Sequence, residues 1–367
     1  MDNFAADCLV LAEEKLAAGK IDRRAFMKIA TLLGAAGPVA LSSGEARAAS
    51  EIVFCNWGGD ATTHYKKAYA EPFEKATGIK VAFDGTGPSV GKIRAMMDAK
   101  KVSWDVMDTT LGVAIELGPL GMLEKIDYSI VDKNKVLPGL ANEYGVAGYI
   151  YSTLIVYDTT KFPGKKPQTW ADFWNVKEFP GKRSFRRDLP AVLEAALLAD
   201  GVPRDKLYPI DVPRAFKKVQ EIKKDCIFWS TGSESQANLR DGETVMGTLW
   251  NTRATGLIED GKGRFAPSWD GAIVQSNAWG VPKGNPAGKD VMKLIASMQD
   301  PGQQIELLRL LGNGPVNPAA AAQVPAELKA RNPSDPSHLA VSVLADNAWY
   351  AANQTTLTPK LLDLLAS

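Results

Sequence analysis

Three tryptophans occupy positions suited to binding an organic cation. Trp57, Trp229 and Trp250 each end a short run of β-prone residues, and in α/β proteins the loops that follow such strands face the ligand cleft. Aromatic faces present negative quadrupole density and hold an organic ammonium, while a carboxylate adds charge and direction. Core packing is the competing explanation for each of the nine tryptophans, and we assign Trp170 and Trp174 to the core. The three strand-end residues are therefore candidates for an ammonium site.

Arginines close to these strand ends would suit a carboxylate. Arg186 and Arg187 stand beside Asp188, and Arg253 comes shortly after the third tryptophan. Because Arg binds carboxylates in a bidentate manner, a cleft with these groups could take a carboxylate at one end of a ligand and an amine at the other. The alternative is that the arginines are solvated or pair with Asp188 for structural reasons.

Charge and composition exclude several other kinds of site. The 367 residues include 43 Lys and Arg against 42 Asp and Glu, and the net charge of +1 provides no field for attracting nucleic acid. His64, His338 and the three cysteines do not stand at metal-ligand spacing. We therefore expect no metal, no cofactor and no nucleic-acid partner. Cys55 and Cys226 are flanked by apolar strand-like residues, which favours two separate buried thiols over a disulfide.

An enzyme and a ferric-ion binder are the alternatives from other functional classes. Paired carboxylates such as Asp105 and Asp108 could serve a hydrolase acting on amines, although short polar residues at strand ends are favoured simply as turn formers. The sequence has no Gly-x-Ser-x-Gly elbow and no dinucleotide or phosphate loop. Tyr149 and Tyr151 are explained more simply as alternating aromatics of a strand than as ferric ligands. Gly58, at a helix start, could donate backbone hydrogen bonds to an anion. We expect no enzymatic activity.

The candidate residues need a scaffold that brings strand ends together. Short β-prone runs alternate with helical spacing in the first part of the chain: β at 52–57, 79–83 and 104–107, helix at 62–77 and 89–100. Such alternation predicts parallel strands covered by helices, with the loops gathered at the carboxyl ends of the strands. The pattern resumes after residue 169, and a β run at 272–281 with a helix at 289–298 returns to the pattern of the first part. A chain of this length divides by default into about two domains, and we predict crossovers near residues 152 and 276.

The first 48 residues resemble an export signal. An Arg23-Arg24 pair stands before an apolar run of 13 residues at 29–41, which is shorter than the roughly 20 residues needed to span a bilayer. Ala46-Arg47-Ala48 matches the small-x-small pattern of a signal-peptidase site. We therefore predict that residues 1–48 are a twin-arginine signal peptide, and that the mature protein is periplasmic.

Four blocks of sequence carry a resemblance to one known family. In the family's order they are Phe54-x-Asn56-Trp57, then Trp104-Asp105-Val106, then Thr169-Trp170-Ala171-Asp172-Phe173-Trp174 with Pro180-Gly181-Lys182, and last Gly242-Glu243-x-x-Met246-Gly247-x-x-Trp250-Asn251. With these blocks, spread over nearly all of residues 50–350, the chain resembles the periplasmic spermidine/putrescine-binding family of ABC importer solute-binding proteins.

The resemblance implies a fold, a partner and a set of site residues. It implies an α/β, two-lobe periplasmic-binding-protein fold, each lobe a β-sheet flanked by helices, with the ligand in the interlobe cleft. We expect residues 49–152 and 277–325 to form lobe 1, and residues 153–276 and 326–367 to form lobe 2. The family's members are typically monomers that deliver a polyamine or related small amine to a membrane permease and its ATPase. The family motif places in the cleft Trp57, Thr109, Asp188, Trp229 and Trp250, with Trp349 as a further candidate.

Two departures from the family pattern concern the ligand. Ala191 stands where the family's polyamine pocket has a glutamate, and Gln275-Ser276-Asn277 stands where it has Trp-x-Asp, so two carboxylates that pair with ammonium groups are neutral here. With Asn277 in the cleft and Arg253 nearby, the chain would suit a zwitterionic ω-amino acid such as 4-aminobutyrate. Both ligand classes stay open: a polyamine such as putrescine or spermidine, and an ω-amino acid.

Overall fold

The structure, a computed structural model, describes residues 51–367. The predicted signal peptide therefore lies outside the described residues. Within the described range, no helix is both long enough and apolar enough to cross a membrane.

The first half of the chain forms the alternating unit that the sequence predicts. β1 pairs in parallel with β2 on one side and with β3 on the other. Gly78, in the left-handed conformation, ends helix α4 as expected, and the side chains of Ser89 and Thr110 cap the helices that follow β2 and β3. The elements are β1 (Glu51–Cys55), α3 (Asp60–Tyr65), a π-helical turn (Lys66–Ala70), α4 (Glu71–Thr77), β2 (Lys80–Asp84), α5 (Val90–Asp98), β3 (Val106–Thr110) and α6 (Leu111–Leu117).

A second α/β unit follows. β6 pairs in parallel with β7 and β8, and β5 pairs antiparallel with β8. Its elements are β5 (Tyr149–Asp158), α7 (Trp170–Trp174), β6 (Arg183–Arg186), α8 (Val192–Ala199), α9 (Val212–Ile222), β7 (Cys226–Trp229), α10 (Gly232–Arg240), β8 (Met246–Trp250) and α11 (Asn251–Asp260).

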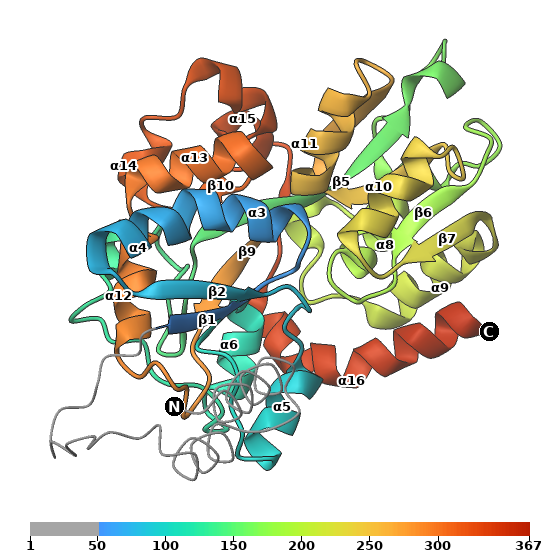
Figure 1. The fold of residues 1–367 in the computed structure, drawn as a ribbon. Coiled ribbons are helices and arrows are strands. Elements are labelled where there is room, and N and C mark those ends of the chain that lie inside the picture. The colour runs from blue at the N-terminus through green and yellow to red at the C-terminus, as the bar shows by residue number, and fades with distance from the viewer. Residues whose placement is uncertain (1–50) are drawn as a thin grey trace, which may run out of the picture. The chain divides into compact units, whose positions relative to one another are not determined.

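One long strand, β9 (Phe265–Gly280), joins the two units. Its first part, up to Ser276, pairs antiparallel with β5, and residues 277–280 pair antiparallel with β3. The strand order is β2-β1-β3-β9-β5-β8-β6-β7, and Figure 1 shows β9 between the strands of the two units. The expectation of parallel strands is therefore correct for β1, β2 and β3 and for β6, β7 and β8. It is wrong for β5 and β9, which pair antiparallel with their neighbours in these two groups.

The two largest hydrophobic core clusters of the described residues lie one in each unit, and we refer to the two units as the first and second lobes. The core of the first lobe gathers around the mutually packed rings of Phe54, Tyr65 and Trp279. The core of the second lobe gathers around Phe173 and Phe185, together with the buried face of α8. The boundaries of the lobes along the chain stay a prediction from the sequence.

Helices complete the C-terminal part of the chain. The 20-residue helix α16 contacts α6 of the first lobe and α9 of the second, and Figure 1 shows it running below both lobes. No sequence pattern discussed above indicated it. The late elements are α12 (Asp290–Ser297), α13 (Pro301–Leu311), α14 (Pro318–Ala321), α15 (Pro336–Leu339) and α16 (Asn347–Ala366), with the short strands β4 (Gly145–Val146), β10 (Gly314–Pro315) and β11 (Val343–Leu344).

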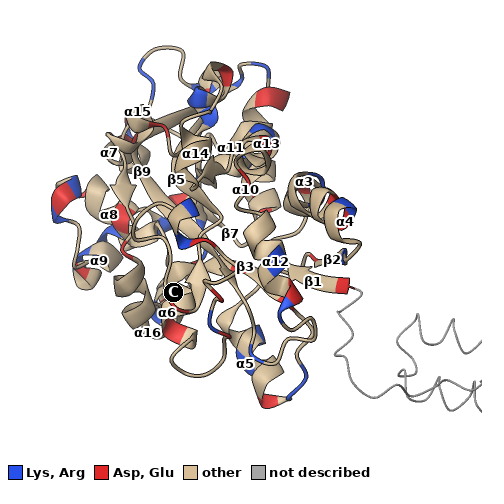
Figure 2. Ribbon diagram, turned by 90° about the vertical axis from the view of Figure 1, so that its left-hand side faces the viewer, with Lys and Arg blue, Asp and Glu red and all other residues tan. Residues whose placement is uncertain are grey.

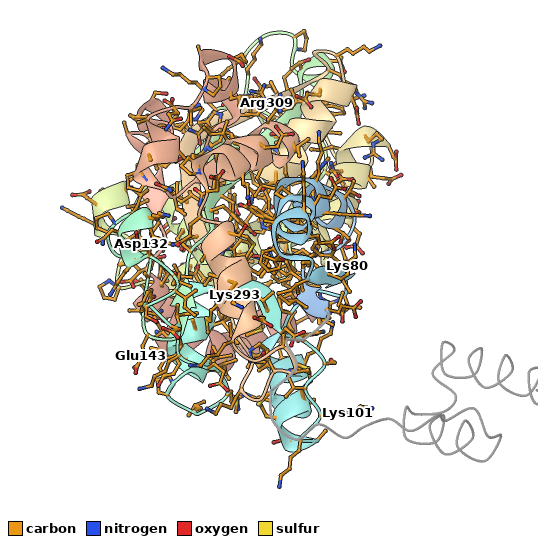
Figure 3. All side chains as sticks on the ribbon, turned by 60° about the vertical axis from the view of Figure 1, so that its left-hand side comes forward. Lys80, Lys101, Asp132, Glu143, Lys293 and Arg309 are labelled. Atoms are coloured by element: carbon orange, nitrogen blue, oxygen red, sulfur yellow. The ribbon has the colours of Figure 1, made fainter. Side chains whose placement is uncertain are left out.

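Lys and Arg positions and Asp and Glu positions are interspersed along the ribbon of the described residues (Figure 2). The charged side chains labelled in Figure 3, among them Lys80 and Lys101, are exposed at the periphery. Cys55 is buried, Cys226 is partly buried, and both are free thiols, as predicted.

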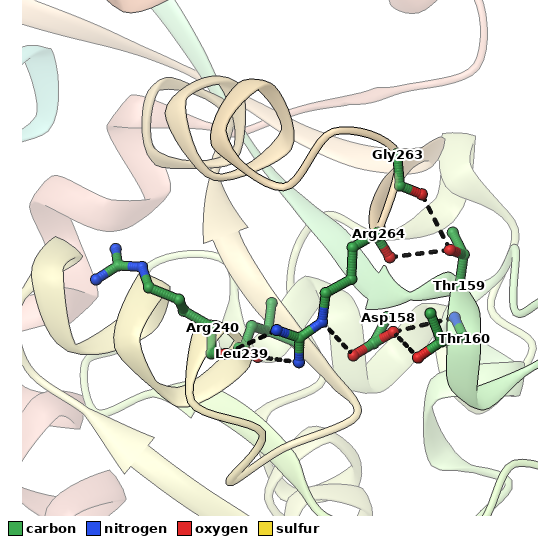
Figure 4. A network of polar contacts seen from close by, with 7 residues as sticks. All are labelled: Asp158, Thr159, Thr160, Leu239, Arg240, Gly263 and Arg264. Atoms are coloured by element: carbon green, nitrogen blue, oxygen red, sulfur yellow. Dashed lines mark hydrogen bonds and ion pairs between the residues drawn. The ribbon is translucent and has the colours of Figure 1, made fainter.

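The buried carboxylate of Asp158, the last residue of β5, accepts several hydrogen bonds that hold this end of the strand. Asp158 accepts hydrogen bonds from the backbone N–H and the hydroxyl of Thr160, at 3.0 and 2.6 Å, and from Nε of Arg264 at 2.9 Å (Figure 4). Arg264 also donates to the carbonyl oxygens of Leu239 and Arg240. Burial opposes ionisation, but these donors hold the pKa of Asp158 below its ordinary value. The network ties β5 to β9 and to the end of α10 within the second lobe.

Candidate ligand-binding cleft

A cavity of about 540 Å³ lies at the ends of the strands, with walls from both lobes. Of the nine residues predicted from the sequence for the ligand site, seven line it: Trp57, Thr109, Asp188, Trp229, Trp250, Arg253 and Asn277. Five of them lie at or just after the ends of β1, β3, β6, β7 and β8, Arg253 lies on the first turn of α11, and Asn277 lies within β9, which pairs with both β3 and β5.

Gly58 and Trp349 lie outside this lining. The backbone N–H of Gly58 donates to the side chain of Asn56 at 2.8 Å, so it is not free for an anion. Gly58 has a φ of 70°, and a Cβ there would lie 2.5 Å from the carbonyl oxygen of Gly85, so a tight turn explains the glycine. Trp349 packs in the second lobe against the rings of Tyr208 and Tyr350.

The three strand-end tryptophans form one aromatic wall. The ring of Trp250 packs edge-on against Trp229 at 5.4 Å between centroids, and Trp57 of the first lobe lies 6.2 Å from Trp250. Trp57 is 40% exposed, whereas Trp229 is only 1% exposed. Nε1 of Trp229 and of Trp250 is buried, and within the described residues neither N–H donates to a protein atom. The wall therefore places three aromatic rings at the cavity.

Arg186 and Asp188 form an ion pair on one side of the cavity. Nη2 of Arg186 lies 2.8 Å from Oδ2 of Asp188, and the guanidinium stacks over Trp250 at 5.1 Å. The alternative that the sequence left open, an arginine paired with Asp188, is thus the arrangement found. Among residues 51–367, Asp188 is the only acidic residue in the lining, alongside Arg186, Arg187 and Arg253.

Arg253 is the most buried of the three arginines. Its residue is 5% exposed, on the first turn of α11, and burial lowers the pKa of its guanidinium. Nη1 lies 3.3 Å from Oδ2 of Asp60, a largely exposed carboxylate of the first lobe. A Cβ at Gly232 would lie 2.4 Å from Nε of Arg253, so only glycine leaves room for this side chain. The Asp60 contact is long, and it spans the cleft from one lobe to the other.

A buried carboxylate behind the cavity wall was not foreseen as a site residue. Asp108 is 0% exposed and accepts hydrogen bonds from the hydroxyls of Tyr65 (2.9 Å) and Tyr149 (2.9 and 2.8 Å) and from Nδ2 of Asn277 (3.0 Å). Burial raises the pKa of Asp108 to about 6, against the opposing effect of these donors. All three donors line the cavity.

The expectation that Asp105 and Asp108 serve local turns is wrong. Asp105 accepts from the backbone N–H groups of Val53 (2.7 Å) and Ala287 (2.6 Å), so it joins β1 to the segment before α12. The partners of Asp108 are likewise distant in sequence. Local turn chemistry could not show this, because spacing along the chain says nothing of contacts between separate elements.

The turn that presents Asp188 is held in an unusual backbone conformation. Ala191, at the start of α8, has a φ of 70°, which is left-handed for a residue with a Cβ. The hydroxyl of Tyr350 accepts from the N–H of Ala191 at 3.3 Å and donates to the buried carboxylate of Glu194 at 2.7 Å. The C-terminal helix α16 thereby fixes the turn beside the cavity.

Two α/β lobes joined by shared strands, with a charged aromatic cavity at their junction, define a two-lobe periplasmic-binding-protein fold. The family model of bacterial extracellular solute-binding proteins matches residues 68–336. A gamma-aminobutyric acid-binding protein of Pseudomonas aeruginosa is 34% identical over 294 residues, which is 78% of this chain and 83% of the relative.

Solved structures give the same answer for the fold. A GABA receptor is 36% identical with a TM-score of 0.78, over 86% of this chain and 98% of that one. The protein MotA of A. tumefaciens B6, solved in complex with glucopine, is 28% identical with a TM-score of 0.81, over 86% and 99%. The chain belongs to the bacterial extracellular solute-binding protein family, and it is a solute-binding protein of the ABC-transporter type.

Proposed function

We propose that the protein captures a small amino acid whose amine and carboxylate lie at opposite ends, such as 4-aminobutyrate, and presents it to an ABC permease and its ATPase in the periplasm. The observation that carries this proposal is the charge of the cavity lining. It holds three arginines and one acid, and that acid is already paired with Arg186. A guanidinium attracts a carboxylate and repels an ammonium.

The polyamine that the family resemblance suggested from the sequence fits this lining less well. A diamine brings two positive charges, and a lining with an excess of guanidinium groups offers it repulsion at one end. The GABA-binding relatives support the amino acid instead. Export by a twin-arginine signal, a monomeric state and the absence of enzymatic activity complete the proposal.

A larger amino acid with a polar extension is the second candidate. A cavity of about 540 Å³ lies within the range of pockets that enclose drug-sized ligands. Its lining continues past the charged residues to Ser89 at the start of α5 and to Gln354 and Thr358 of α16. Glucopine, the ligand of one relative, is a suitable probe for this class.

Titration calorimetry of the mature protein tests the proposal. With 4-aminobutyrate, putrescine and glucopine as ligands, we expect binding of an amino acid and little or no binding of putrescine. Arg253→Ala should abolish binding of the amino acid and leave putrescine unchanged or improved, whereas the exposed control Arg309→Ala should change neither. Preferential binding of putrescine by the wild-type protein would refute the proposal.

A further inference from the structure

Asp108 is a buried charge without a cationic partner. Its carboxylate is fully buried, and within the described residues no Lys, Arg or His forms an ion pair with it. Its hydrogen bonds come from Tyr65, Tyr149 and Asn277, which are all neutral. A buried carboxylate that only neutral groups solvate is costly to the fold, so its retention calls for a reason.

The network leaves little freedom in how these groups are oriented. Oδ1 of Asn277 accepts from the backbone N–H groups of Gly148 (2.8 Å) and Tyr149 (2.9 Å), which turns its Nδ2 toward Asp108. Each tyrosine gives its one hydroxyl proton to Asp108. A phenol that has donated its proton can only accept further hydrogen bonds, so both phenol oxygens are left as acceptors polarised by the carboxylate.

Every side chain that bonds Asp108 is also part of the cavity lining. The carboxylate thus stands one layer behind the part of the cavity wall that Tyr65, Tyr149 and Asn277 form. On the second-lobe wall the single acid, Asp188, is neutralised by Arg186 at 2.8 Å. Within the part of the chain that the structure describes, Asp108 meets no arginine, and three of the side chains that line the cavity, Tyr65, Tyr149 and Asn277, bond to it. Glu194, another fully buried acid that bonds a lining residue, accepts from Tyr350 and belongs to α8 of the second lobe.

We propose that Asp108, acting through Tyr65 and Tyr149, is the positioning residue for the ligand's ammonium group and so fixes the direction of the ligand in the cleft. The ammonium end faces Tyr65 and Tyr149, and the carboxylate end faces the arginines of the second lobe. This assignment rests on the proposed function. It departs from the sequence prediction that Asp188 receives the ammonium: in our assignment Asp188 orients Arg186.

The test compares two ligands that differ only at the amine. The mature wild-type protein and Asp108→Asn are titrated with 4-aminobutyrate and with 4-hydroxybutyrate, which has the same length and a neutral hydroxyl. Because a hydrogen bond to a charged group contributes more than one between neutral groups, Asp108→Asn should lower the affinity for 4-aminobutyrate about 10-fold or more. The affinity for 4-hydroxybutyrate should change by less than about 3-fold. Asp188→Asn should not reproduce this selective loss.

Single hydroxyl deletions provide a second variant and its matched control. Tyr149→Phe keeps the ring in the wall and should also weaken 4-aminobutyrate selectively, even if Asp108→Asn fails to fold. Tyr69→Phe is the control, because the Tyr69 hydroxyl is buried without a hydrogen-bond partner within residues 51–367 and lies outside the lining.

The outcomes separate the two claims. Equal losses for both ligands, or no loss in either variant, would overturn the positioning role while leaving the amino-acid function standing. A wild-type protein that binds neither 4-aminobutyrate nor its hydroxyl analogue would overturn the proposed function and the assignment with it.

Discussion

The pH dependence of stability offers a direct measure of the charge on Asp108. Its pKa is raised from 3.8 to about 6 by burial, so the folded protein holds this proton more tightly than the unfolded chain does. Between roughly pH 4 and pH 6 the folded state therefore carries more bound protons, and the free energy of unfolding falls as the pH rises. The difference of about two pKa units corresponds to about 3 kcal/mol, present in full below pH 4 and lost above pH 6.

Asp108→Asn removes this titration. The amide can meet the surrounding donors only in part, which adds a penalty that does not depend on pH. The free energy of unfolding of the wild-type protein minus that of the variant should thus decrease by about 3 kcal/mol from pH 4 to pH 8. Urea unfolding followed by tryptophan fluorescence and circular dichroism measures it, and coincident transitions establish two-state behaviour.

The comparison of the two proteins isolates one group. Other titratable side chains, including His64 and the buried Glu194, occur in both proteins and cancel in the difference. The tyrosines around Asp108 have pKa values well above this range, because burial disfavours their ionised forms. A difference in stability that stays constant from pH 4 to pH 8 would refute the assignment of a raised pKa to Asp108.

Three further outcomes are expected. Ala191→Gly should raise the free energy of unfolding by up to about 1 kcal/mol, because glycine adopts a φ of 70° without the Cβ penalty; urea unfolding measures it, and destabilisation would contradict it. Replacing Arg23 and Arg24 by lysines should leave precursor in the cytoplasm, while amino-terminal sequencing of periplasmic wild-type protein should begin at Ala49. Saturating 4-aminobutyrate should reduce the radius of gyration in X-ray scattering as the lobes close, and an unchanged value would count against hinge bending.

Local pattern predicted the elements of each lobe and the tryptophan wall. The β-α-β-α-β series, the stop at Gly78 and the strand ends at Trp229 and Trp250 all follow from hydrophobic spacing and turn chemistry within short windows. These signals are local because each helix or strand buries one face, and the spacing of apolar residues that this requires does not depend on which element packs against it. Seven cavity residues were accessible in this way or through the family motif.

The charge arrangement of the cleft could not be predicted from sequence. The hydroxyls that solvate Asp108 lie 41 and 43 positions away from it, and the amide of Asn277 lies 169 positions away. Spacing places Tyr65 on a helix face and Tyr149 in a strand, but it does not say that both meet one carboxylate. The antiparallel pairing of β9 with β3 brings Asn277 to Asp108. Neither the composition nor the hydrophobic periodicity of the sequence predicts this pairing.

Two buried charged groups at the cleft carry an electrostatic cost in the protein by itself. Asp108 is fully buried with a pKa of about 6, and Arg253 is 5% exposed with one long contact to Asp60. A zwitterion reduces both costs at once, since each of its ends brings the charge that one wall lacks. A diamine relieves the first and worsens the second, and a dicarboxylate does the reverse. Discrimination between these ligands therefore follows from two buried charges on opposite lobes, and it strengthens when the lobes close and exclude water, because charges interact more strongly at low dielectric.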